Sequence, residues 1–93
     1  MGKMEIISLE LTLQEARYLM VALVGVMHEC NVRTRGAVTA LPAYRIYELL
    51  RQTLGEGRTY CDITSSVAPW EWGNLSQKER EAIVFSPSGA GGG

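Results

Sequence analysis

A run of apolar residues at positions 18–27, YLMVALVGVM, constrains the fold of this 93-residue chain more than any other feature. The run is shorter than the ~20 residues that a membrane-spanning helix needs. Just before it, Thr12 and Glu15 have the spacing of a reciprocal capping box, in which each side chain accepts a hydrogen bond from the other residue's backbone N–H. Together these features predict a helix over residues 13–30, with Asn31 as a left-handed stop.

The apolar run also predicts self-association. A helix that is hydrophobic on every face has to be buried on every face, and a chain of this length hides only about two thirds of its unfolded surface when it folds. We therefore expect a second copy of the chain to cover the helix in a homo-oligomer, most simply a dimer. The expected interface residues are Met20, Leu23, Val24 and Met27. The alternative is a central helix that its own chain wraps.

Two further segments predict helices. Pro42 suits the first turn of a helix, where its missing N–H does no harm, and Gly55 suits the position just after the last turn. Between them, Tyr47 and other apolar residues recur at helical spacing. Ser76 and Glu79 repeat the capping pattern and begin a third helix. Its end stays open, because AIVF at 82–85 would serve equally well as a strand.

Alternating apolar residues predict two strands. In residues 5–11, EIISLEL, every second residue from Ile7 is apolar, and residues 58–64, RTYCDIT, show a weaker alternation. We therefore expect an α+β fold, with two to three helices packed on a small sheet, as one domain over residues 1–86. We expect residues 87–93 to form a flexible glycine-rich tail. The alternative fold is a small all-α bundle with an N-terminal arm.

The sequence offers little for catalysis. His28 is the single histidine and lies within the apolar run's helix, which favours a packed residue over a catalytic base. Its spacing from Cys30 and Cys61 matches no established zinc pattern, and no phosphate loop, dinucleotide fingerprint or nucleophile elbow is present. We therefore expect no enzyme, no cofactor and no metal.

Charge and targeting signals narrow the expected partners. The formal net charge is −1, so no long-range field attracts nucleic acid or an anionic membrane. The first residues lack the apolar core of an export signal. We therefore expect a cytoplasmic protein whose two cysteines, Cys30 and Cys61, are reduced. The alternative is a single disulfide bridge between them.

A few exposed positions are candidates for contact with a partner or ligand. Arg33 and Arg35 in the RTRG loop could hold an anion by charge-assisted hydrogen bonds. Trp70 and Trp72 in PWEWGN are expected to point to opposite sides, one onto the core and one outward, and Tyr44 lies near the edge of a buried stripe. Tryptophan and arginine are enriched among interface hot spots.

These features favour a non-catalytic, small oligomeric interaction module that binds and modulates another protein. Such a chain would be an accessory or inhibitor protein of the kind that phages and mobile elements encode. The alternative is a ligand-sequestering protein that binds a small anionic molecule, such as a nucleotide, between an arginine and an aromatic ring.

Overall fold

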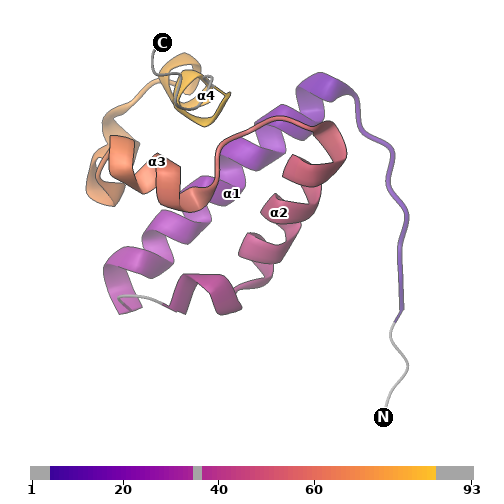
Figure 1. The fold of residues 1–93 in the computed structure, drawn as a ribbon, viewed down its shortest axis with the longest axis horizontal. Coiled ribbons are helices and arrows are strands. Elements are labelled where there is room, and N and C mark those ends of the chain that lie inside the picture. The colour runs from indigo at the N-terminus through magenta and orange to yellow at the C-terminus, as the bar shows by residue number, and fades with distance from the viewer. Residues whose placement is uncertain (1–4, 35–36, 86–93) are drawn as a thin grey trace.

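The computed structural model describes residues 5–34 and 37–85, and the described chain is helical (Figure 1). The elements in chain order are α1 (Leu13–Thr34), the short 3₁₀ helix η1 (Ala37–Ala40), α2 (Pro42–Leu54), α3 (Tyr60–Ser66), the 3₁₀ helix η2 (Pro69–Asn74) and α4 (Gln77–Phe85). The described residues contain no strand, so the expected α+β fold is wrong and the all-α alternative with an N-terminal arm is favoured. The expected glycine-rich tail, residues 87–93, lies outside the described residues.

The first expected strand, residues 5–11, is an extended arm. Figure 1 shows this segment running away from the helices before α1 begins. Its side chains are exposed: 85% of Ile7 and 71% of Leu9 face solvent. A strand is defined by the hydrogen bonds that it exchanges with a neighbouring strand, and the described part of this chain supplies no neighbour. Apolar residues do alternate in this segment, but the described chain has no sheet that the segment could join.

The second expected strand, residues 58–64, contains the first turns of α3 instead. Thr59 is the N-cap of this helix, and its side-chain oxygen accepts a hydrogen bond from the backbone N–H of Asp62 at 3.2 Å. Tyr60 and Ile63, three residues apart, both face the core, which is helical spacing. The cap at Thr59 therefore predicts the helical structure of this segment, whereas the weak alternation of apolar residues predicts a strand that does not form.

Both capping boxes form as predicted. The backbone N–H of Glu15 donates to Thr12 Oγ1 at 3.1 Å, and the N–H of Thr12 donates to Glu15 Oε1 at 2.9 Å. Ser76 and Glu79 make the same pair of bonds, at 3.1 and 2.8 Å, at the start of α4. Helix α4 continues to Phe85, so residues 82–85 are helical and form no strand.

The ends of the other helices test two stop signals. The stop predicted after α2 is confirmed, because Gly55 caps this helix in the left-handed conformation, with φ of 70°. The stop predicted at Asn31 is wrong, because α1 runs on to Thr34. Asn31 lies within the helix, and its side-chain amide donates a hydrogen bond to the hydroxyl of Tyr60 on α3 at 3.4 Å.

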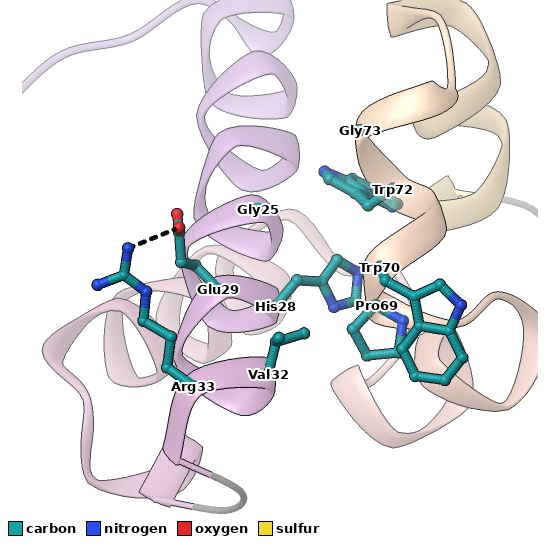
Figure 2. Close-up of a pocket in the computed structure, with 9 residues that line it drawn as sticks. All are labelled: Gly25, His28, Glu29, Val32, Arg33, Pro69, Trp70, Trp72 and Gly73. Atoms are coloured by element: carbon teal, nitrogen blue, oxygen red, sulfur yellow. Dashed lines mark ion pairs between the residues drawn. The ribbon is translucent and has the colours of Figure 1, made fainter.

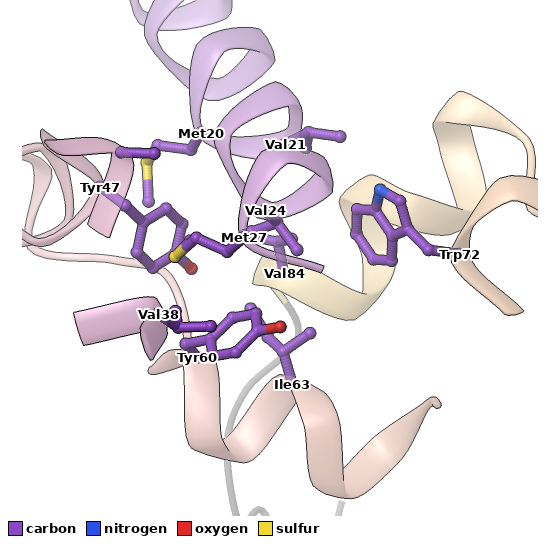
Figure 3. Packing of buried hydrophobic residues seen from close by; sticks show 11 residues of the cluster. Met20, Val21, Val24, Met27, Val38, Tyr47, Tyr60, Ile63, Trp72 and Val84 are labelled. Atoms are coloured by element: carbon purple, nitrogen blue, oxygen red, sulfur yellow. The ribbon is translucent and has the colours of Figure 1, made fainter. Parts of the chain in front are cut away.

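Helix α1 is the central element, in contact with α2, η1, η2 and α4. Side chains from these elements and from α3 meet around it in one buried cluster (Figure 3). Met20, Val24 and Met27 have no exposed surface, and Leu23 is half-buried against the same cluster. The expectation that a second copy covers Met20, Val24 and Met27 is therefore wrong, because their own chain covers them.

The link between α2 and α3 is pinned to the core by several contacts. Gly57 has a φ of 106°, and a Cβ atom there would lie 2.8 Å from Cε of Met20. The next residue, Arg58, donates its backbone N–H to the carbonyl of Val84 at 2.8 Å and accepts from the hydroxyl of Tyr47 at 2.5 Å. These bonds join α2, the link and α4.

Candidate functional site

The two tryptophans of PWEWGN have separate environments. Both lie on η2, where Trp72 is 5% exposed and Trp70 is 74% exposed. The predicted division, one ring inward and one outward, is confirmed. The expected reason was an extended backbone, whereas this segment is a 3₁₀ helix. Side chains two residues apart on a 3₁₀ helix also point in different directions.

Trp72 closes the core over α1. Gly25 makes this approach possible, since a Cβ atom at that position would lie 3.4 Å from Nε1 of Trp72. The Arg80 side chain also holds this segment, with Nε donating to the Trp72 carbonyl at 3.0 Å and the guanidinium 5.6 Å from the ring centroid. Trp72 is therefore a core residue that leaves 5% of its surface exposed.

His28 lies at the buried edge of this region, with 3% of its surface exposed. Its Nδ1 atom is 2.8 Å from the hydroxyl of Tyr60, and its ring centroid is 4.9 Å from that of Trp72. Burial lowers the pKa of His28 to about 4, so the ring is neutral at pH 7. Among the described residues, the Nε2 atom has no hydrogen-bond partner.

A groove of about 340 Å³ lies between α1 and η2 (Figure 2). Its walls are formed by residues of α1 (Gly25, His28, Glu29, Val32 and Arg33) and of η2 (Pro69, Trp70, Trp72 and Gly73). A neighbouring hollow of about 320 Å³ shares Val32, Pro69 and Trp70, so these three side chains stand between the two. Most of this surface is apolar, as is usual for sites that bind small molecules.

The expected contact residues are only partly brought together. Arg33 lines the groove but pairs with Glu29 at 3.5 Å, and Figure 2 shows its side chain pointing away from Trp70. Tyr44 is half-buried on α2 against the core and does not line the groove. Arg35 lies outside the described residues. The pairing of an arginine with an aromatic ring therefore does not form between Arg33 and Trp70.

Sequence reasoning missed the residues that shape the groove. His28 and Val32 are four residues apart on one helix and therefore share a face, which the sequence does show. That η2 packs against this face is a contact between distant segments, and no local pattern reveals it. The interpretation of His28 as a packed residue is confirmed by its burial.

Two properties of the described residues bear on the chemistry of the groove. A histidine with a pKa near 4 is a weak base at neutral pH, because proton transfer is most efficient when the pKa lies near the working pH. Within the described ranges, no three His, Cys, Asp or Glu side chains gather closely enough to hold a metal ion.

Two broader findings bound the interpretation. No helix in the described part of the chain combines the length and apolarity that crossing a membrane requires. Comparison of the chain with protein-family models, with curated proteins and with solved structures finds no match.

Proposed function

We propose that the protein is a non-catalytic interaction module, which binds and modulates another protein through its N-terminal arm, residues 5–12. One observation carries this proposal: the arm holds large apolar side chains outside the core. Ile6 and Ile7 are each 85% exposed, and Leu9 is 71% exposed. Exposed apolar groups that lie together, rather than singly, commonly mark interaction sites.

The pattern of the arm suggests how it docks. Ile7 and Leu9 share one face of the extended segment, while Ser8 and Glu10 share the other. An extended peptide with this alternation can add to the edge of a partner's sheet, where main-chain hydrogen bonds give affinity and alternate side chains give specificity. Full burial of each large apolar side chain would contribute about 1.5–3 kcal/mol.

The root of the arm extends the same surface onto the helices. Leu11, Tyr18 and Leu19 line a shallow hollow of about 610 Å³, with Gln77 and Glu81 of α4 at its rim. Tyr18 is 62% exposed, so part of this apolar surface is open. A partner that binds the arm would therefore also contact α1 at its N-terminal end.

Oligomerisation remains part of the proposal, with a different surface from the one expected. The buried residues of α1 leave no need for a second copy, whereas the arm of one chain can dock on another copy at the same hollow. Such an exchange is isologous, because each copy supplies both the arm and its receptor.

The mass of the chain in solution tests this step. We expect the parent chain to exceed the monomer mass by light scattering at roughly 100 µM, and the double variant Ile7→Ser, Leu9→Ser to be monomeric. The matched control, Ser8→Ala with Glu10→Gln, changes the other face of the arm and should behave like the parent. A monomeric parent chain would contradict oligomerisation through the arm.

Capture of a second protein is tested from the same positions. A chain with a photo-crosslinking residue in place of Ile7 should label a partner. An excess of the unlabelled parent chain should compete for that partner and reduce the labelling. The Ile7→Ser, Leu9→Ser variant should fail to compete, while the Ser8→Ala, Glu10→Gln control should compete fully. Equal competition by both variants would show that the arm is not the binding element.

A further inference from the structure

An unpaired hydrogen-bond donor lies at the base of the groove between α1 and η2. The hydroxyl of Tyr60 accepts from Asn31 at 3.4 Å, so its own proton is directed to Nδ1 of His28 at 2.8 Å. In the neutral ring the remaining proton is then on Nε2. That atom is buried and has no partner among the described residues. A buried donor without an acceptor costs about 1–3 kcal/mol.

The residue that carries this donor lines the groove, while the Nε2 atom itself is buried. Figure 2 shows the His28 ring reaching from α1 toward Pro69 and Trp70 on η2. Because Nδ1 is held by Tyr60, Nε2 lies on the side of the ring away from this hydroxyl. A ligand acceptor that reached this side would satisfy the only polar group of His28 that its own chain leaves unpaired within the described residues.

The walls favour a flat and uncharged ligand. Val32 is 53% exposed and Trp70 is 74% exposed, so together with Pro69 they present apolar surface at the mouth of the groove. The cation at the rim, Arg33, is paired with Glu29. A neutral donor in an apolar site suits a neutral acceptor, because an anion would lose its hydration there without a cation to replace it.

We propose that this groove binds a planar aromatic ligand that carries a neutral hydrogen-bond acceptor, either a ring nitrogen or a carbonyl oxygen. The acceptor takes the proton of His28 Nε2, and the ring stacks against Trp70, whose exposed side chain turns to admit it. The site does not depend on the arm, which leaves the opposite end of α1 (Figure 1). It replaces the arginine-centred anion site that the sequence predicts.

Quinoline and indole form a probe pair that tests the acceptor. Both are planar bicycles of similar size, but quinoline has a ring-nitrogen acceptor and indole has only a donor. Because His28 is the single histidine, its ring ¹⁵N signals can be followed by NMR without ambiguity during each titration. We expect quinoline to shift the Nε2 signal with saturation and to bind at least about tenfold more tightly than indole.

Two variants locate the site. His28→Phe removes the donor and should weaken quinoline binding by about tenfold or more, which corresponds to one good hydrogen bond. Trp70→Ala should weaken it as well, and it remains informative if His28→Phe fails to fold, because Trp70 is mostly exposed. Leu49→Ala removes a partly exposed apolar side chain of α2 that does not line the groove, so this variant is the control and should leave binding unchanged.

Adenosine and adenosine monophosphate separate the proposed chemistry from anion capture. Equal binding of the two supports recognition of the ring, whereas binding of the monophosphate alone overturns the proposal in favour of an anion site. The proposal is also overturned by equal binding of quinoline and indole, by an absence of saturable shifts, or by quinoline binding that both His28→Phe and Trp70→Ala leave unchanged.

Discussion

The hydroxyl of Tyr60 lies 2.8 Å from Nδ1 of His28, and this contact joins α3 to α1 in the interior. It fixes the orientation of the single histidine, while the neighbouring ring of Trp72 covers its face at a centroid distance of 4.9 Å. Burial raises the pKa of Tyr60 and lowers that of His28, so both groups are neutral at pH 7. The interior at this point therefore tolerates polar side chains only in their uncharged forms.

This arrangement predicts that the protein loses stability in mild acid. The pKa of His28 is 6.5 in the unfolded chain and about 4 in the folded one. Between these values the unfolded state binds more protons, so the free energy of unfolding rises with pH from about 4 to about 6.5 and is constant above that range. The total change attributable to His28 is roughly 3 kcal/mol. Urea unfolding at several pH values measures it.

The His28→Gln variant is the control for this slope. It should unfold with nearly the same free energy at pH 5 as at neutral pH. Glu56, whose pKa is lowered by its hydrogen bond from Arg17, adds an acid-dependent slope only near and below its ordinary value, in both proteins. A variant that keeps the full slope between about pH 5 and 6.5 would show that His28 is not its cause.

The parts of the fold that the sequence predicts well are those set by local bonds. The capping pairs Thr12 with Glu15 and Ser76 with Glu79 each join a side chain to a backbone N–H three residues away. Such bonds form whatever the rest of the chain does. Gly55 is similar, because a left-handed residue after a helix favours glycine in any context.

The parts that the sequence predicts poorly depend on distant segments. Whether residues 5–11 form a strand depends on a second strand, and none exists in the described chain. Whether Val24 faces a second copy depends on how completely α2, η1, η2 and α4 surround α1. The groove likewise exists because η2 packs against His28 and Val32, more than thirty-five residues earlier in the chain.

Burial of Met20 predicts a core substitution that is independent of oligomeric state. Met20→Ala should lower the free energy of unfolding by about 2–5 kcal/mol, because it leaves a cavity beside Tyr47 in the centre of the molecule. In the Ile7→Ser, Leu9→Ser background, which removes association through the arm, the unfolding midpoint should not change on dilution, since Met20 contacts its own chain. In that background, a midpoint that falls on dilution with Met20 present and not with Met20→Ala would instead place this residue at an interface.

The link between α2 and α3 predicts an unequal effect of two glycine substitutions. Gly55 and Gly57 both have positive φ, at 70° and 106°. A Cβ at Gly55 meets nothing within 4 Å, whereas one at Gly57 lies 2.8 Å from Met20 Cε and 3.3 Å from Arg51 Cγ. Gly55→Ala should therefore cost about 1 kcal/mol of backbone strain.

Gly57→Ala should cost more than Gly55→Ala, by about 1–3 kcal/mol, because the clash with the core adds to the strain. Chemical denaturation of the two variants beside the parent measures both values under the same conditions. Equal losses would mean that the Met20 side chain moves aside without cost. A smaller loss at Gly57 would contradict the packing of this link against α1.

The two tryptophans predict opposite responses to the same substitution. Trp72→Ala should lower the free energy of unfolding by about 3–5 kcal/mol, because a large buried ring is removed from over Gly25. Trp70→Ala should change it by no more than about 0.5 kcal/mol. Single-tryptophan variants separate the rings optically: with Trp70→Phe the remaining emission should be blue-shifted and resist iodide quenching, and with Trp72→Phe it should be red-shifted and quench readily. If iodide quenched Trp72 readily and Trp70 poorly, Trp70 would lie in the core, and the groove would lack the exposed ring at its mouth.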